Sequence, residues 1–356
     1  MPSLDAAEPA RGETDPREAR AGFATSRSRR LLWLMVGFVV LIVIALLSLS
    51  IGARPVPISA VVQSLFRYDG SPDHYVVVYE RLPRTIFGLA VGIALGVAGA
   101  TMQALTRNPL ADPGLLGVNA GAGFAVTCSI AFLGIQSVWG YMWFAFAGAI
   151  AVSLLVYLVG ATGRYGATPG RLLLAGVAIG AVLGGFDTAI NLLDLTVFEA
   201  RLHWGVGSLV GPGFDIAVAT IPFMALGVIL SLCIASSLNS IALGDDLASA
   251  LGTDVVRIRI IGVIAIGLTC GAATAAVGPI AFIGLVIPHI ARWIVGPNQL
   301  WIMLYTMVGA PALLLTADIV GRLILRPGEV EASIITAFLG APVLVYLVRR
   351  KNASGL

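Results

Sequence analysis

The feature that most constrains this sequence is a series of long stretches without a charged residue. One of them, residues 260–291, is too long for a single straight bilayer crossing, because a membrane helix needs only ~20 residues. Gly278, Pro279 and Gly284 fall in its middle. Proline removes a backbone donor and glycine lets two chains approach closely. The stretch therefore predicts two short membrane helices joined by a tight turn that is buried in protein.

Composition agrees with a membrane protein. The chain is 58% hydrophobic and 12% charged, with a mean hydropathy of +0.94, which indicates an all-α polytopic transmembrane protein and not a soluble enzyme. The continuous apolar runs exclude a membrane β-barrel. A formal charge of +3 is too small to indicate nucleic-acid binding. Cys128, Cys233 and Cys270 each lie in an apolar run without a second cysteine or histidine at metal-binding spacing, so we expect them to have packing roles and to form neither a disulfide nor a metal site. No catalytic residue is expected in this chain.

The hydropathy pattern predicts a disordered tail over residues 1–30 and a transmembrane domain over residues 31–350. Ten membrane-spanning helices are expected. They lie near residues 31–51, 85–106, 114–134, 139–160, 172–193, 216–237, 256–276, 280–295, 300–320 and 332–349. A surface helix is expected over 199–213, and residues 52–84 are expected to form a polar loop.

Ten crossings place both termini on the same side of the membrane. With the termini inside, most of the 22 basic residues fall in the tail, the inner loops and the C-terminal end. Because basic residues favour the cytoplasmic side, both termini are predicted to be cytoplasmic and the protein to be a multi-pass component of the cell membrane.

An internal repeat appears at an offset of 170 residues. PLADPGLL, which contains Pro109 and Gly114, is echoed by PIAFIGLV, which contains Pro279 and Gly284. The copies begin in the second and seventh spans, so they run in opposite senses across the bilayer. Inverted repeats with broken helices are typical of proteins that move a solute by alternating access. Chance similarity between two tight helical turns is the alternative.

The sequence contains no ATP-hydrolysing motif that could supply energy for transport. Lys351 is its only lysine and lies outside any glycine loop, so the sequence contains no Walker A site. ATP and magnesium would then belong to a separate ATPase, and no cofactor is expected here. An ion-coupled carrier would instead need ionisable side chains within the membrane, for which Asp187, Asp194 and Asp318 are candidates. Asp318 lies four residues before Arg322, a spacing typical of a structural ion pair.

Three polar residues share one face of the fifth predicted span. Asp187, Asn191 and Asp194 are spaced i, i+4 and i+7, so they lie on the same side of a helix. They are interpreted as lining a watery substrate pathway. The alternative is a polar seam satisfied by neighbouring helices or by water.

A partner-binding helix is predicted between the sixth and seventh spans, over residues 244–252. Two aspartates begin it, a glycine ends it, and two leucines project from one face. A short exposed helix with an apolar face usually docks on a partner, here a cytoplasmic ATPase. A helix lying in lipid headgroups would carry basic residues instead. The candidate contact residues are Gly244, Asp245, Asp246, Leu247, Ala248, Leu251 and Gly252.

Several motifs together resemble the FecCD family, the permease subunits of ABC importers for ferric siderophores, haem and cobalamin. The resemblance extends over about residues 31–350. The motifs are RLPRTIFGLAVG, MQALTRNPLADPGLLGVNAGAG, ALGDDLASALG, GPIAFIGLVIPHIAR, ADIVGRL and ITAFLGAP.

This resemblance implies a function and a set of partners. The expected function is import of ferric siderophores, with haem or cobalamin as the alternative cargo. Expected partners are a second permease subunit, identical or different, two cytoplasmic ATPase subunits, and an extracytoplasmic binding protein. The family's docking arginines match Arg81, Arg84 and Arg322, and its pathway helices match the fifth and tenth spans.

This sequence differs from the family pattern at one motif, and two other classes of protein remain as alternatives. Many family members read ELPVG where this chain has EVEAS at residues 329–333, which leaves the identity of the cargo open. The alternative structural roles are that Arg322 pairs only with Asp318 and that Arg84 only anchors its helix. A secondary transporter coupled to an ion gradient, and an intramembrane hydrolase, are the more remote alternatives.

Overall fold

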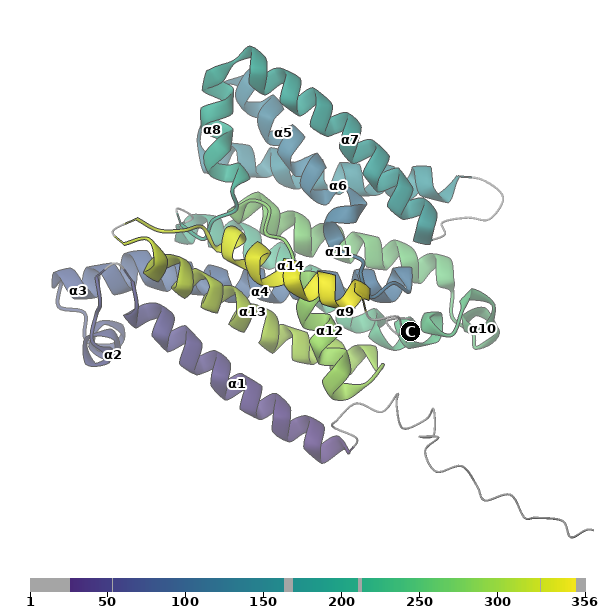
Figure 1. Ribbon diagram of the computed structural model, residues 1–356, viewed down its shortest axis with the longest axis horizontal. Helices are drawn as coiled ribbons and strands as arrows, with labels where there is room; N and C mark the ends of the chain where they lie inside the picture. The colour runs from purple at the N-terminus through teal and green to yellow at the C-terminus, as the bar shows by residue number, and fades with distance from the viewer. Residues whose placement is uncertain (1–25, 53, 163–168, 211–212, 327, 350–356) are drawn as a thin grey trace, which may run out of the picture.

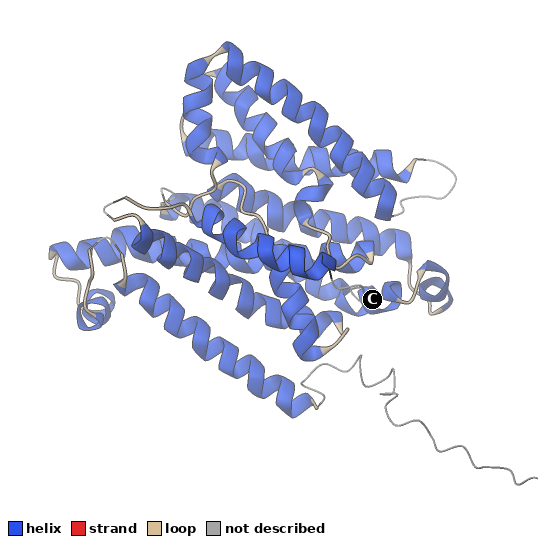
Figure 2. Ribbon diagram, viewed as in Figure 1, coloured by secondary structure: helices blue, strands red, loops and turns tan. Residues whose placement is uncertain are grey.

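The computed structural model describes residues 26–52, 54–162, 169–210, 213–326 and 328–349. Helices and the loops between them account for all of these residues, and no strand occurs among them (Figure 2). The all-α fold class predicted from the sequence is confirmed. Seven helices are long and apolar enough to cross a membrane, and three shorter apolar helices accompany them. These fall on the ten predicted ranges, but the number of actual crossings stays a prediction.

The long helices follow the hydropathy pattern closely. They are α1 (Arg27–Ser50), α4 (Leu82–Thr106), α5 (Val118–Leu133), α6 (Val138–Ala161), α7 (Pro169–Leu193), α9 (Phe214–Ala242), α11 (Val255–Val277), α12 (Ile283–Val295), α13 (Gln299–Ile324) and α14 (Ala332–Arg349). Short helices connect them. These are α2 (Ile58–Phe66), α3 (Pro72–Tyr75), a π-helical segment (Val76–Arg81), a 3-10 turn (Pro113–Leu116), α8 (Leu195–Gly205) and α10 (Asp245–Ala250).

The first helix begins earlier than the sequence pattern suggested. α1 starts at Arg27, inside the segment predicted as tail, because Ser26 caps the helix with a side chain that accepts a hydrogen bond from the Arg29 amide at 3.3 Å. The basic residues there looked like tail composition but form the first helical turn. Most of the predicted tail, residues 1–25, lies outside the described residues.

The segment predicted as a polar loop, residues 52–84, is largely helical. After α2, the chain is helical without a break from Pro72 to Thr106. The π-helical segment directly precedes Pro83. Because proline lacks an amide hydrogen and crowds the preceding turn, a local change of hydrogen-bond register lets the helix continue through it.

α4 and α11 form the centre of the bundle. In each, 78% of the most apolar stretch is buried, against 11% in α1 and in α7. Figure 1 shows α4 and α11 in the middle, α1 along one edge, and α5 to α8 grouped at the opposite edge. α4 packs against α9, α11, α12 and α13. The two central helices are the ones that the 170-residue offset relates to each other.

The break predicted inside residues 260–291 lies between α11 and α12. Gly278 has φ 77°, a conformation that favours glycine, and a Cβ there would lie 2.1 Å from the carbonyl oxygen of Trp204. Pro279 follows it, and the turn packs directly against the backbone at the end of α8. No side chain other than hydrogen fits at residue 278.

The two copies of the repeat meet backbone to backbone. A Cβ on Gly99 of α4 would lie 1.9 Å from the carbonyl oxygen of Gly284 in α12. Close to this contact, the Gln103 amide nitrogen donates to the carbonyls of Gly284 and Leu285 at 3.3 and 3.2 Å. In the other copy, the Thr274 hydroxyl of α11 donates to the Asn119 side chain of α5 at 3.2 Å. Each broken helix is therefore bound to the opposite repeat.

The equivalent turn of the first copy contains Pro109 and Gly114. Its shape is set by two side chains that accept hydrogen bonds from the backbone two residues ahead. The Asn108 oxygen accepts from the Leu110 amide at 3.0 Å, and the Asp112 carboxylate accepts from the Gly114 amide at 2.8 Å. The chain therefore turns tightly before α5 begins.

Candidate functional site

Two polar regions lie at opposite ends of the bundle. Figure 1 shows α10 at one end, the end where α1 begins, and α2 and α3 at the other. The predicted partner-binding helix therefore lies far from the predicted docking arginines.

The helix predicted over residues 244–252 is present but shorter, and its role in binding a partner stays a prediction. α10 covers Asp245–Ala250, within the predicted 244–252, and glycines with positive φ flank it. Gly244 has φ 109° and Gly252 has φ 84°. The Thr253 amide donates back to the Ala248 carbonyl at 2.9 Å, which closes the helix end.

One face of α10 is buried and the other is exposed. Ala248 is completely buried, which seats the helix on the bundle. Leu243, Leu247 and Leu251 are 60%, 58% and 65% exposed, and Asp246 is also exposed. Leucines so exposed on a charged, structured loop form an apolar surface that suits a protein partner.

Asp245 binds α10 to both central helices. Its carboxylate accepts hydrogen bonds from one Arg259 nitrogen of α11 at 2.9 and 3.0 Å. It also lies 3.7 Å from a guanidinium nitrogen of Arg107, the residue at the C-terminal end of α4. A force on α10 would therefore reach the two repeat-related helices directly.

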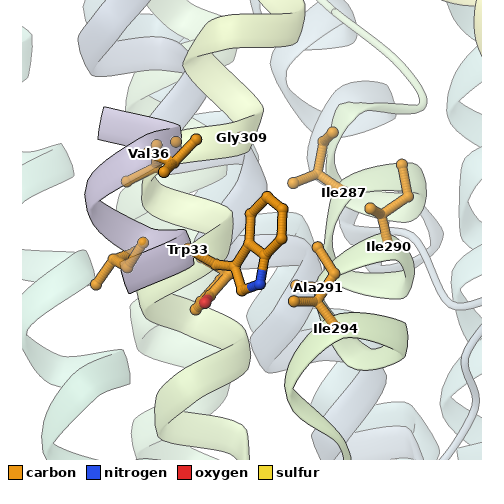
Figure 3. A pocket seen from close by; sticks show the side chains of 11 residues that line it. Trp33, Val36, Ile287, Ile290, Ala291, Ile294 and Gly309 are labelled. Carbon is orange, nitrogen blue, oxygen red and sulfur yellow. The ribbon is translucent and has the colours of Figure 1, made fainter. Parts of the chain in front are cut away.

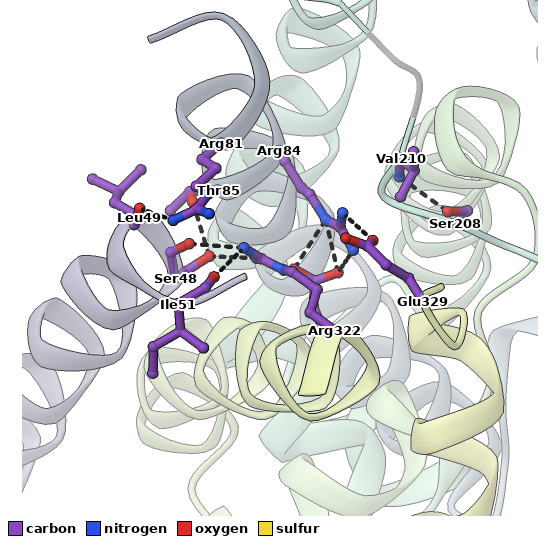
Figure 4. Close-up of polar contacts among 11 residues, drawn as sticks. Ser48, Leu49, Ile51, Arg81, Arg84, Thr85, Ser208, Val210, Arg322 and Glu329 are labelled. Carbon is purple, nitrogen blue, oxygen red and sulfur yellow. Dashed lines mark hydrogen bonds and ion pairs between the residues drawn. The ribbon is translucent and has the colours of Figure 1, made fainter. Parts of the chain in front are cut away.

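At the other end of the bundle, backbone carbonyls at the end of α1 and in the segment after it bind the Arg81 side chain. Its guanidinium donates to the carbonyl of Leu49 at 2.9 Å (Figure 4). It also donates to the carbonyl of Ser50 at 2.7 Å and to the carbonyl of Arg54. The residue is 6% exposed. It closes the loop after α1 against the start of α4.

Arg84 and Arg322 share one buried carboxylate. Arg84 binds both oxygens of Asp318, the closer at 2.6 Å, and pairs with Glu329 at 2.6 Å (Figure 4). Arg322 pairs with the same aspartate. It also donates to the carbonyls of Ser48 and Ile51 at 2.8 and 2.9 Å. The network ties the end of α1 to α4 and α13.

The arrangement bears on the predicted docking role. Arg322 is 2% exposed, so an incoming acidic residue could reach it only after these bonds rearrange. Arg84 is the most accessible of the three, since its second partner, Glu329, is itself exposed. The docking role of Arg81, Arg84 and Arg322 stays a prediction.

The three polar residues predicted on one face of the fifth span do not all lie there. α7 ends at Leu193, and Asp194 leaves the helix to cap α8, accepting from the Thr196 amide at 2.8 Å. The Thr196 hydroxyl also donates to the Asp194 carboxylate, at 2.7 Å, and this bond together with that from the Thr196 amide lowers the pKa of the Asp194 carboxyl. The prediction that Asp194 continues the helix of Asp187 and Asn191 was wrong, because aspartate is strongly preferred at the N-cap position and Asp194 takes that position at the start of α8.

Asp187 and Asn191 remain in α7 and are partly satisfied within the chain. The Asp187 carboxylate accepts from the Thr127 hydroxyl and lies 2.8 Å from a nitrogen of Arg201 in α8. The Asn191 nitrogen donates to the Asp187 carbonyl at 2.8 Å, while its side-chain oxygen is buried without a protein partner. Arg201 was missed by the sequence analysis. Its signal was a basic residue in a short, mostly apolar helix that also contains Glu199.

Two broken helices from the two halves of the chain, in contact at the centre of the bundle, are the architecture typical of a transport permease. No three His, Cys, Asp or Glu side chains of the described residues cluster as metal ligands.

The comparisons with known proteins agree. The chain belongs to the FecCD transport family, whose model matches residues 40–350. It is 49% identical to the ferric enterobactin transport system permease protein FepD of Escherichia coli (strain K12), over 90% of this chain and 96% of that protein. It is 37% identical to the probable siderophore transport system permease protein YfiZ of Bacillus subtilis (strain 168), over 82% and 87%.

A solved structure shares the fold. It is described as an inward-facing conformation of a putative metal-chelate type ABC transporter. The two match with a TM-score of 0.77 and 26% sequence identity, over 91% of this chain and 100% of that one. The family expected from the motifs is therefore confirmed.

Proposed function

We propose that this permease carries ferric siderophore complexes into the cytoplasm as the membrane subunit of an ATP-driven importer. The observation that carries the proposal is the 49% identity, nearly end to end, to a protein named for ferric enterobactin transport. Relatives named for hydroxamate and citrate complexes of iron, at 36% and 37% identity, support an iron chelate as cargo.

The energy would come from a separate chain. The only lysine is Lys351, so no Walker A loop can form here. The exposed leucines of α10 give a cytoplasmic ATPase a surface to grip, and its nucleotide and magnesium would remain in that partner. Two such ATPases, a second permease subunit and an extracytoplasmic binding protein complete the proposed assembly. Both termini would be cytoplasmic, which places α10 on the same side as the ATPases.

Alternating access would couple these parts. Closure of the ATPases pushes α10, and Asp245 passes the displacement to α11 through Arg259 and to α4 through Arg107. Because α4 and α12 touch through Gly99 and Gly284, the two repeats rock as packed units and not as independent helices.

The pathway would lie against α7 and α14. Both helices expose large apolar side chains, such as Phe186 and Phe338, and α7 also carries the Asp187 and Asn191 pair. A second subunit facing these helices would enclose a channel of weak contacts, which suits a bulky chelate better than a tight site. Asp194, at the end of α7, would lie at the channel mouth.

Arg84 is the best-placed of the proposed docking residues. Its partner Glu329 belongs to the EVEAS segment in which this chain departs from its family pattern. An acidic residue of the binding protein would replace Glu329 at Arg84 and so loosen the link between α4 and the loop before α14. Arg81 and Arg322 would support this site from behind.

The test is uptake by cells that lack the chromosomal gene and carry it on a plasmid. Radiolabelled iron is supplied as a catecholate, a hydroxamate or a citrate complex, with haem and labelled cobalamin as separate substrates. We expect gene-dependent uptake of one or more ferric chelates and none of cobalamin. Gene-dependent uptake of cobalamin or haem alone would reject the siderophore assignment.

A further inference from the structure

A groove on the side of the bundle has no part in the proposed transport pathway. It lies between α1, α12 and α13 and has a volume of about 250 Å³. Figure 3 shows Trp33 and Val36 of α1 on one side and Ile287, Ile290 and Ala291 of α12 on the other. Its lining is apolar almost throughout. The groove could therefore hold hydrocarbon but offers nothing to a polar chelate.

Small residues keep the groove open. A Cβ on Gly37 of α1 would lie 3.3 Å from a Val308 methyl, and one on Gly309 of α13 would lie 2.9 Å from an Ile287 methyl. α1 itself is largely unburied, and Trp33 is more than half exposed. The groove therefore opens on the outer surface of the bundle, where lipid surrounds a membrane protein.

One end of this groove is strongly basic. Arg29 precedes Trp33 by four residues and so lies one turn away on the same face of α1. Arg27 belongs to the same first turn but starts from a different face of the helix, and both side chains are exposed. The Arg30 guanidinium lies 5.8 Å from the centre of the Trp301 ring, and the Tyr305 hydroxyl donates to the Arg30 carbonyl at 2.6 Å. These contacts hold the first turn of α1 against α13.

No carboxylate of the groove helices balances this charge. Residues 19–68 contain no Asp or Glu, and neither do residues 255–317, so α1, α12 and most of α13 lack acidic side chains. The first acid in α13 is Asp318, at the other end of the bundle, where Arg84 and Arg322 occupy it. The basic end of the groove is complementary to an anion.

We propose that the groove binds an anionic phospholipid, with part of one acyl chain between α1 and α12 and the phosphate at the first turn of α1, against Arg29, with Arg27 as a second positive charge in the same turn. The groove is smaller than the ~300–1,000 Å³ of pockets for drug-sized ligands, so it has room for a segment of one hydrocarbon chain and not for a bulky ligand. Basic residues beside a membrane helix attract anionic headgroups of the inner leaflet. Tryptophans at the level of the headgroups, as Trp33 and Trp301 would be, commonly anchor such an interface.

The binding would have a consequence for α12. That helix follows the broken turn at Gly278 and contacts the opposite repeat through Gly284. A lipid chain packed between α1 and α12 would add apolar contacts to the face of α12 that lines the groove, at Ile287, Ile290 and Ile294. Anionic lipid would then stabilise the fold without touching the transport pathway.

Native mass spectrometry of the purified permease assembly tests the proposal. Phosphatidylglycerol and phosphatidylcholine of the same chain length are the probes, and glycerol phosphate is the soluble headgroup. At ~1 kcal/mol for each basic side chain near the headgroup, phosphatidylglycerol should bind about tenfold or more tightly than phosphatidylcholine. Glycerol phosphate should not compete, because the acyl chain supplies much of the affinity.

Three variants locate the site. The double variant R27Q/R29Q should bring the ratio of the two affinities close to one, whereas R257Q, an exposed arginine far from the groove, should leave it unchanged. G37L fills the groove and should weaken both lipids alike. V36F fills it from an exposed position and provides a second reading if G37L folds poorly.

Several results would overturn the proposal. The first is equal affinity for phosphatidylglycerol and phosphatidylcholine. The second is a preference for phosphatidylglycerol that is unchanged in R27Q/R29Q. The third is undiminished lipid binding in both G37L and V36F. Lipid binding by the isolated chain but not by the assembly would show instead that another membrane helix covers the groove. None of these results depends on what the permease transports.

Discussion

Replacing Gly99 by alanine tests the contact between the two repeats. The added Cβ would lie 1.9 Å from the Gly284 carbonyl oxygen and 2.3 Å from two further backbone atoms of the same residue. Those atoms belong to helix backbone and cannot rotate away, so α4 and α12 must separate by about 1 Å or more to restore a normal contact. Overpacking of this kind costs ~1–3 kcal/mol, and the rigid neighbour places Gly99→Ala at the upper end.

The assay is thermal unfolding of the purified permease in one fixed detergent and lipid mixture. At roughly 2 °C for each kcal/mol in a chain of this size, the midpoint of Gly99→Ala should fall by about 6 °C. Gly184→Ala is the matched control, because nothing lies within 4 Å of a Cβ at that helical position. Alanine there should be neutral or stabilising by ~0.5–1 kcal/mol. Equal midpoints for the two variants would refute the close approach of α4 and α12.

Three further experiments probe the charged and exposed regions. Arg322→Met leaves the buried Asp318 with one arginine partner, so it should lower the free energy of unfolding by ~3–5 kcal/mol, measured by thermal unfolding without any binding protein present. Arg67→Gln, at an exposed arginine, is the control. Equal unfolding midpoints for the two variants would show that the Arg322 network does not stabilise the fold. In a double-mutant cycle, Asp187→Asn and Arg201→Gln should show coupling of ~1–3 kcal/mol, and additive effects would mean that the 2.8 Å pair contributes nothing. Leu247→Ser should abolish co-purification of the ATPase and iron uptake while leaving the unfolding midpoint unchanged, because the side chain is largely exposed; retained uptake would exclude α10 as the ATPase contact.

Much of the fold could be predicted because hydropathy is a local signal. The uncharged runs gave the long helices to within a few residues, and glycine and proline gave the turn at residues 278–279. The errors arose where polar residues carried local structure. Ser26 extends α1, a π-helical segment carries the chain into Pro83, and Asp194 caps α8 instead of continuing α7. Capping and register shifts depend on backbone geometry that composition does not reveal.

The candidate sites were predicted less completely, since they depend on contacts between distant segments. The exposed leucines of α10 followed from spacing alone, as did the Asp318 and Arg322 pair. No local pattern indicates that Arg84 binds a carboxylate 234 residues later. Nor does the sequence indicate that Arg81 is satisfied by three backbone carbonyls. The family pattern assigned these arginines to a partner, whereas the folded chain supplies acceptors of its own.

The central claim is that this chain is a conduit whose energy is supplied elsewhere, through α10. The most direct measurement is uptake of a ferric siderophore by proteoliposomes that contain the permease assembly and its binding protein, with and without the ATPase subunits and ATP. The account predicts uptake only when both the ATPase and ATP are present, and none when Leu247 is replaced by serine. Uptake of the same chelate by the permease alone, driven by an imposed ion gradient, would contradict it.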